Sequence, residues 1–175
     1  MTMNNALHEV FVHNIQDIYN SEKQLTAALP KMRDLAQNPD LREAIGAHLS
    51  ETQEHVRRIE QVCRLLGCGT GNVTCQATTG LIREAQEQMQ EFAPGPGGDA
   101  AIIGCAQKVE HYEISNYGTV IEWAKQMDHD DVLDLLKETL KEESAANEKL
   151  TKIAEKQVNE AAREAQPVGS GASLM

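Results

Sequence analysis

Carboxylates interrupt the apolar stripes of three of the four long helices that the sequence predicts. Glu22 falls in the stripe of the first helix, Glu110 and Glu113 in that of the third, and Glu143 in that of the fourth. Apolar residues precede and follow each of them at helical spacing, so these acids point toward the packed interior. An unpaired carboxylate there costs several kcal/mol or becomes protonated. Each of these acids therefore needs a partner.

The second helix offers imidazoles as well as a carboxylate. His48, Glu51 and His55 follow one another at spacings of three and four, which places them on one face of a helix. The best apolar stripe of this helix runs from Ile45 to Leu66, and the triplet lies on its shoulder. We expect this face to border a site shared with the acids of the other helices.

A cation from outside the sequence is the economical partner for these acids, because no Lys or Arg occupies the apolar stripes. Any one acid alone could instead pair with a basic side chain elsewhere, or reach solvent at a helix boundary. Oxygen ligands with imidazole suit iron or manganese better than zinc or calcium. Tyr117, one turn from Glu113, either hydrogen-bonds to this site or is a buried tyrosine with an unrelated partner.

The elements that must position these residues are helices. The chain has 175 residues, of which 41% are hydrophobic and 3% aromatic, and helix formers dominate it. This composition favours an all-α fold in one domain. The hydrophobic period predicts long helices over residues 5–32, 40–66 with Asp40 as N-cap, 99–127 with Asp99 as N-cap, and 130–158.

Short connections join these helices into two antiparallel hairpins, and a long crossover links the hairpins. The crossover, residues 67–98, holds one helix over about residues 74–92 and then "APGPGG", which we expect to be non-helical. Two hairpins joined by one crossover are typical of a ferritin-like four-helix bundle. We assign residues 1–160 to this bundle and expect residues 161–175 to be a disordered tail.

Charge and hydropathy exclude several classes of partner. The formal net charge of −11 argues against binding to nucleic acid or to an anionic membrane surface. With no apolar run of membrane-spanning length and no signal peptide pattern, the expected location is the cytoplasm. The cysteines are expected to be reduced thiols, with a zinc site or a disulfide as the alternatives. They are Cys63, Cys68, Cys75 and Cys105.

Four ordered segments resemble the helix motifs of the YciF/YciE-type stress proteins, a family of the ferritin-like superfamily. They are "IYNSEKQLTAALPKM", "HLSETQEHVRRIEQV", "AAIIGCAQKVEHYEISNYGT" and "LLKETLKEESAANEKLT". The likeness covers about residues 5–155. It implies a ferritin-like bundle, paired as a homodimer, with a candidate dinuclear metal site. It does not specify a reaction.

The resemblance also implies a ligand set. The superfamily pattern is one Glu from each of two helices and a Glu-x-x-His from each of the other two. In this sequence His55 follows Glu51 by four residues instead of three, and Asn147 stands near the place of a histidine after Glu143. The metal ligands implied by this match are Glu22, Glu51, His55, Glu110, Glu113 and Glu143.

Two functions follow from these expectations. The first is a redox metalloprotein with two iron or manganese ions per chain, bridged by Glu51 and Glu143, that reduces peroxide or dioxygen. The expected terminal ligands are Glu22, His55, Glu110 and Glu113. The second is a non-enzymatic dimeric stress scaffold with a degenerate or vacant metal site. Apolar residues outside or beside the inner stripes support a homodimer. They are Leu7, Val10, Ile114, Ile121, Val132 and Leu135.

Overall fold

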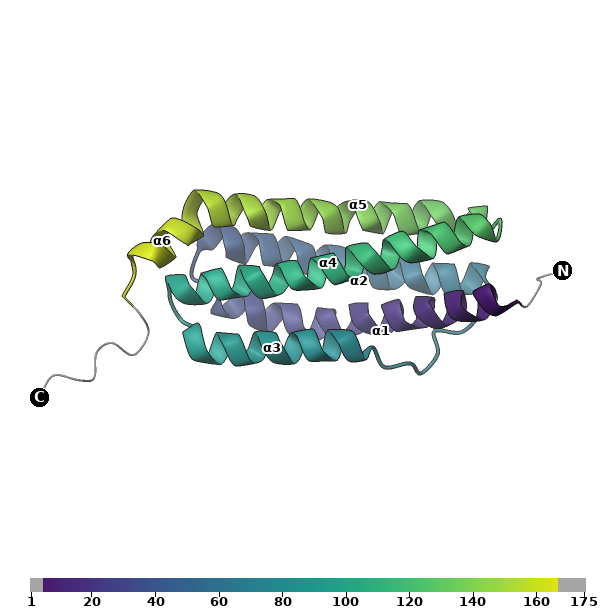
Figure 1. The fold of residues 1–175 in the computed structure, drawn as a ribbon, viewed down its shortest axis with the longest axis horizontal. Coiled ribbons are helices and arrows are strands. Elements are labelled where there is room, and N and C mark those ends of the chain that lie inside the picture. Colours follow the sequence, from purple (N-terminus) through teal and green to yellow (C-terminus); the bar gives the residue numbers. More distant parts are fainter. Residues whose placement is uncertain (1–4, 167–175) are drawn as a thin grey trace, which may run out of the picture.

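The computed structural model describes residues 5–166, and this part of the chain is helical throughout apart from its connections (Figure 1). No helix in these residues combines the length and the apolar character that crossing a membrane requires. The elements are α1 (Ala6–Leu35), α2 (Pro39–Leu65), α3 (Gln76–Phe92), α4 (Pro96–Gln126), α5 (Asp130–Ile153), a π-helical turn (Ala154–Val158) and α6 (Asn159–Glu164).

The long helices form a four-helix bundle made of two hairpins. α1 packs along α2 and α4 along α5, while α2 also contacts α5 and α1 contacts α4. α3 lies outside the bundle against α1 and α4, and it belongs to the crossover from one hairpin to the other (Figure 1). This arrangement confirms the predicted all-α, ferritin-like fold.

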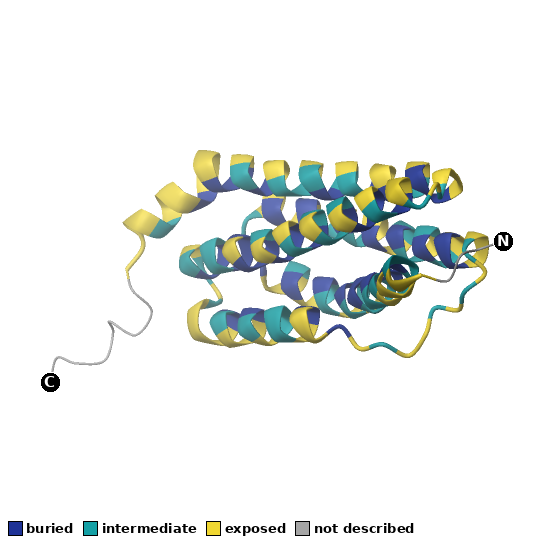
Figure 2. Cartoon of the chain, turned by 45° about the vertical axis from the view of Figure 1, so that its right-hand side comes forward, coloured by how far each residue is buried: buried dark blue, intermediate teal, exposed yellow. Residues whose placement is uncertain are grey.

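The apolar interior consists of two clusters with a polar layer between them. One cluster includes Leu25, Leu29 and Ile45, and the other includes Phe11 and Ile15. Buried residues face inward along all four long helices (Figure 2). The two apolar clusters hold the helices together on both sides of this layer. The polar side chains of the layer are therefore kept away from solvent.

The N-cap of α2 is Asn38, not Asp40. The Asn38 side chain accepts a hydrogen bond from the Leu41 backbone N–H at 3.0 Å, and Pro39 occupies the first helical position. Asparagine is a strong N-cap residue, and proline fits the first turn because its missing N–H would have no intrahelical partner there. The predicted N-cap was therefore two residues too late in the sequence.

α4 begins at Pro96, earlier than the predicted start at Asp99. Gly95 precedes the helix with φ 133°, a backbone conformation that favours glycine, and Pro96 again occupies the first turn. The end of "APGPGG" is therefore helical, and the expectation that this segment stops all helical structure was wrong for residues 96–98.

Asp99 has a tertiary role instead of a capping one. It is 5% exposed, and its carboxylate oxygens accept hydrogen bonds from the backbone N–H groups of Gln37 and Asn38, both at 2.8 Å. The start of α4 is thereby tied to the loop between α1 and α2. The acid satisfies two backbone donors that would otherwise be left without partners.

We expect Asp99→Ala to lower the free energy of unfolding by roughly 2–4 kcal/mol, because two N–H groups lose a charged acceptor. Urea unfolding followed by circular dichroism measures this change. Asp134→Ala, at an exposed position of α5, is the matched control and should shift the midpoint little. Equal midpoints for the two variants would contradict the structural role of Asp99.

The C-terminal boundary differs from the predicted one. The fourth long helix passes at Ile153 into the π-helical turn, and Val158 at its end is buried against the apolar core. α6 then continues through residues 161–164, which were expected to be disordered. The segment "NEAARE" is rich in helix formers, which accounts for the extension. The rest of the expected tail, residues 167–175, lies outside the described residues.

Two of the apolar residues expected at a dimer interface belong to the core of the chain itself. Ile121 and Val132 are buried in the cluster that also contains Phe11. They lie at the end of the bundle where the α4–α5 turn closes over α1, so helix packing within the chain already covers them. Val10, in contrast, is 46% exposed.

Candidate metal centre

Side chains from all four long helices converge in the polar layer of the bundle. α1 contributes one acid, α2 two histidines, α4 two acids and α5 one acid, and all six are buried. They are Glu22, His48, His55, Glu110, Glu113 and Glu143. Because each long helix places at least one of these side chains between the two apolar clusters, the bundle itself assembles the site.

The six residues form two groups that share Glu143. The His48 group consists of His48, Glu110, Glu113 and Glu143, and the His55 group of Glu22, His55 and Glu143. Within each group, one nitrogen or oxygen from every member lies within 4.8 Å of the others. Each group offers the carboxylate and imidazole ligands that could hold a metal ion.

Each histidine turns one ring nitrogen toward the carboxylates. His55 Nδ1 lies 2.9 Å from Glu143 Oε1 and 3.6 Å from Glu22 Oε1. His48 Nε2 lies 3.2 Å from Glu110 Oε1 and 3.7 Å from Glu143 Oε2. Both imidazoles therefore face the shared carboxylate from α2.

The centre is short of hydrogen-bond partners. In the described part of the chain, eight buried side-chain nitrogen or oxygen atoms make no hydrogen bond, and all eight belong to these six residues. Both oxygens of Glu113 and both of Glu143 are among them. Proteins pair nearly all their buried polar atoms, so this concentration of unpaired atoms in one place fits a site built around a cation.

Burial and mutual repulsion govern the pKa values of the acids. Burial, followed by the charges of neighbouring carboxylates, raises the pKa of Glu113 well above its usual range. Burial is also the largest cause of the raised pKa values of Glu22 and Glu110. Burial acts on Glu143 in the same direction, but its contacts with His55 and His48 outweigh it and lower the pKa of this acid.

Burial and the surrounding carboxylates have opposite effects on the pKa values of the two histidines. Burial disfavours their charged forms, yet the carboxylate of Glu110 and its neighbours raise the pKa of His48 to about 9. Glu143 and Glu22 likewise overcome burial and raise the pKa of His55 to about 11. Both imidazoles therefore keep a proton at neutral pH, which offsets part of the negative charge of the cluster, and a cation bound there has to displace these protons.

The ring nitrogen of each histidine that points away from the cluster faces an outer carboxylate. His55 Nε2 lies 2.8 Å from Glu142 Oε2, and His48 Nδ1 lies 3.5 Å from Glu51 Oε2. Arg58 contacts both oxygens of Glu142, with Nη2 3.1 Å from Oε1. A carboxylate behind a histidine orients the ring and fixes which nitrogen carries the proton.

Tyr117 joins the site from α4. Its hydroxyl donates a hydrogen bond of 2.6 Å to Glu22 Oε1, in a fully buried position. Burial and the negative charge of Glu22 raise the pKa of Tyr117 well above its usual range, so the phenol keeps its proton and remains the donor. Of the two readings of Tyr117, the hydrogen-bonding partner of the site is the correct one.

Five of the residues predicted as ligands lie in the cluster, whereas Glu51 does not. The Glu51 side chain is 46% exposed and reaches only the outer nitrogen of His48. Residues 48 and 55 are nearly two full turns apart and so lie along one line of α2, while position 51 is rotated toward solvent. The seven-residue spacing of His48 and His55 was the signal that could have identified His48.

The donor set matches the superfamily in number but not in distribution. The superfamily pattern has four Glu and two His, and the cluster has the same inventory. Here α2 supplies both histidines and α4 supplies the pair Glu110 and Glu113, so the missing Glu-x-x-His motifs remove no donor. Asn147 is not part of the cluster and accepts a hydrogen bond from Gln107 at 3.2 Å.

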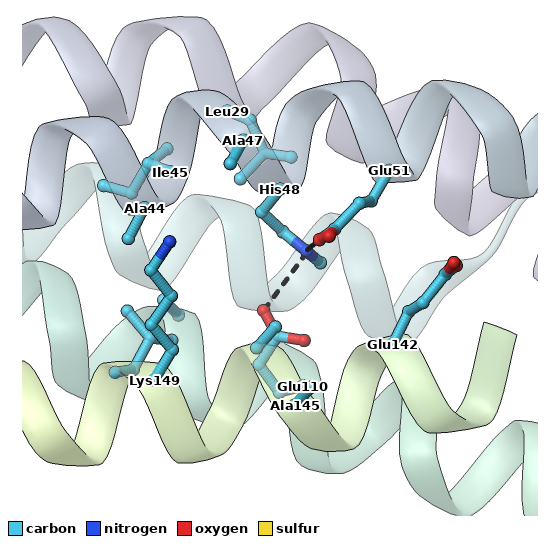
Figure 3. A pocket seen from close by; sticks show the side chains of 13 residues that line it. Leu29, Ala44, Ile45, Ala47, His48, Glu51, Glu110, Glu142, Ala145 and Lys149 are labelled. Atoms are coloured by element: carbon cyan, nitrogen blue, oxygen red, sulfur yellow. Dashed lines mark ion pairs between the residues drawn. The ribbon is translucent and has the colours of Figure 1, made fainter.

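A cavity of about 110 Å³ reaches the cluster from the side. His48 and Glu110 line it, together with small side chains such as Ala145, and Figure 3 shows these residues and the contact between His48 and Glu110. The outer acids Glu51 and Glu142 also line the cavity. It has room for a few water-sized molecules and not for a large organic substrate.

Residues 6–163 match a family model described as a domain of unknown function, DUF892. The chain belongs to the DUF892 family. The match spans all the long helices and so includes all six residues of the cluster. The family description itself specifies no reaction.

Relatives of this DUF892 chain include Protein YciF of Escherichia coli K12, with 43% identity over 158 residues, 90% of this chain and 95% of that protein. The crystal structure of the E. coli stress protein YciF superimposes with a TM-score of 0.84 at 42% identity, covering 90% of this chain and 99% of that one. YcfI from Rhodopseudomonas palustris gives a TM-score of 0.83 at 44% identity, covering 88% and 99%. These matches confirm the resemblance to the YciF-type stress proteins.

Proposed function

We propose that this chain is a cytoplasmic stress protein whose six-residue cluster binds two divalent cations, iron or manganese, and reduces a small oxidant. The observation that carries the proposal is the set of eight buried atoms that make no hydrogen bond, all of them in two groups of residues that share Glu143. The four carboxylates of the cluster carry four negative charges when ionised, which two divalent cations neutralise. Mixed carboxylate and imidazole donors suit iron and manganese.

The surrounding residues prepare the site for this role. Glu142, held by Arg58, orients the ring of His55, and Tyr117 fixes one oxygen of Glu22. The cavity beside His48 gives a small oxidant such as peroxide or dioxygen access to the centre. Fe²⁺ held by the six residues of the cluster would supply the electrons for reduction of that oxidant. The apolar clusters on both sides exclude bulk water from the remaining faces.

The alternative is a dimeric scaffold that performs no reaction. The close approach of His55 to Glu143, at 2.9 Å, supports it, because a protonated imidazole stabilises the carboxylate without any metal. In both cases we propose a homodimer in which exposed Val10 and the partly buried Leu7, Ile114 and Leu135 contribute to the interface. A monomer mass in light scattering at micromolar concentration would exclude the dimer.

Metal analysis separates the two functions. Protein purified without chelators and supplied anaerobically with Fe²⁺ should hold about two ions per chain. A ligand at a free concentration of about 100 times its dissociation constant stabilises the folded protein by about 2.7 kcal/mol. Thermal melts with and without chelator measure this stabilisation, and oxidation of the bound iron by peroxide can be followed spectroscopically. Chelator-insensitive melts together with no retained iron would leave the scaffold as the function.

Glu142→Gln should weaken cation binding at the His55 group by roughly 10–100-fold, because the carboxylate that orients His55 loses its charge. The matched control is Glu138→Gln on the same helix, since Glu138 is exposed and contacts Arg58 at 3.3 Å without touching the histidine. Calorimetric titration with Mn²⁺ measures both variants. Equal weakening in the two would assign the effect to Arg58 and not to His55.

A further inference from the structure

The end of α2 brings two cysteines together. Gly67 has φ 67°, its N–H donates to the Arg64 carbonyl at 3.2 Å, and the Cys68 N–H donates to the Cys63 carbonyl at 3.0 Å. This pair of hydrogen bonds is the Schellman motif, which a contact between the side chains of the first and last residues of the turn frequently accompanies. In most helices that contact is apolar, but here both positions are cysteine.

The two thiols have different environments. Cys63 is 2% exposed within an apolar cluster, and Cys68 packs against the same cluster but is only partly buried. Cys68 also lines a surface hollow of about 460 Å³ beside His8 and His13. Burial and the adjacent Cys68 thiol raise the pKa of Cys63 to about 12. Cys68 is therefore the thiol that a dissolved oxidant meets first.

We propose that Cys63 and Cys68 form a redox-active dithiol that hydrogen peroxide converts to an intrachain disulfide. The Cys68 sulfur attacks one peroxide oxygen, the O–O bond breaks, and one water leaves as Cys68 becomes a sulfenic acid. The Cys63 sulfur then attacks the Cys68 sulfur, the S–O bond breaks, and the Cys63 proton leaves with the hydroxyl as a second water. Two thiols are oxidised and one peroxide is reduced.

The other two cysteines provide internal references. Cys75 is buried, and its sulfur contacts the hydroxyls of Tyr112 at 3.0 Å and Thr78 at 3.3 Å. Cys105 is also buried and contacts the side-chain oxygen of Gln88 at 3.4 Å. Their sulfur contacts are with oxygen, so neither stands opposite a second thiol as Cys63 does.

Peptide mapping of the full-length protein tests the dithiol. Trypsin cleaves after Arg64, so Cys63 lies in the peptide of residues 59–64, and Cys68 and Cys75 lie together in that of residues 65–83. The native protein is treated with peroxide, denatured, alkylated, and digested without reductant. We expect a linked pair of these two peptides, lighter by two hydrogens than the separate thiols, while Cys105 stays alkylated.

Two variants assign the bond. Cys75→Ser should retain the linked pair, and Cys68→Ser should lose it and leave Cys63 alkylated. Loss of the pair in Cys75→Ser would overturn the proposal, as would oxidation of Cys68 to a sulfinic acid with Cys63 still free. Circular dichroism checks that both variants are folded. If Cys68→Ser does not fold, Cys75→Ser still tests the proposed bond, because Cys68 is then the one cysteine left in the peptide of residues 65–83. The dithiol does not depend on metal binding at the central cluster.

Discussion

Glu143→Gln is expected to abolish binding of both cations, whereas Glu22→Gln should remove only the cation of the His55 group. Glu143 is the one carboxylate common to both groups, and neither of its oxygens has a hydrogen-bond partner. Glutamine keeps the shape of the side chain but removes its charge, so both groups lose an anionic donor at once. Glu22 contributes to a single group. The predicted stoichiometries are therefore about zero and about one ion per chain.

Elemental analysis after gel filtration in Mn²⁺ measures these stoichiometries directly. Glu148→Gln is the matched control, because Glu148 lies on the same helix as Glu143 but is exposed and pairs only weakly with Lys152, at 3.9 Å. It should retain about two ions. If Glu143→Gln and Glu148→Gln bound equal amounts of metal, the shared carboxylate would have no role in binding and the dinuclear assignment would fail.

The stabilisation by metal is expected to grow with pH, while the metal-free protein becomes less stable. Glu22, Glu110 and Glu113 have raised pKa values, so above about pH 4.5 the unfolded chain releases these protons more readily than the folded chain. His48 and His55, with pKa values of about 9 and about 11, likewise keep protons that the unfolded state loses above its pKa of 6.5.

The direction in which stability changes with pH depends on which state, folded or unfolded, binds more protons. Wherever the folded state binds more protons, stability falls as pH rises, by about 1.4 kcal/mol per pH unit for each retained proton. Glu142 and Glu143 act in the opposite sense, because their lowered pKa values stabilise the fold above about pH 4.5 and this contribution is lost in acid. The metal-free protein should therefore be most stable in weak acid and lose stability toward alkaline pH.

A bound divalent cation reverses this dependence, since it takes the place of the retained protons and competes with them less as pH rises. Thermal melts at about pH 5, 7 and 9 with chelator should show a falling melting temperature, roughly 3–5 °C per pH unit for each retained proton. The increase caused by Mn²⁺ should widen over the same series. A melting temperature that stayed constant from about pH 5 to 9 in the presence of chelator would show that the buried acids and histidines do not exchange protons over this pH range.

Part of the centre follows directly from the sequence. The apolar period of a helix specifies which face packs inward, so Glu22, Glu110, Glu113 and Glu143 had to enter the interior once their neighbours in the stripe were buried. The same period, together with the breaks between the helices, specified the two hairpins and the outer position of α3. These features depend on local spacing, which a linear sequence contains in full.

The remainder depended on the tertiary structure. His48, on the shoulder of its stripe, is inside because packing against α1 and α5 sets the rotation of α2, and the same rotation turns Glu51 toward solvent. Glu142 faces His55 and Arg58 across 87 and 84 residues, contacts for which the spacing within one helix holds no information. Shoulder positions and cross-helix partners are decided by how neighbouring helices meet, because only that contact determines which borderline side chains water still reaches.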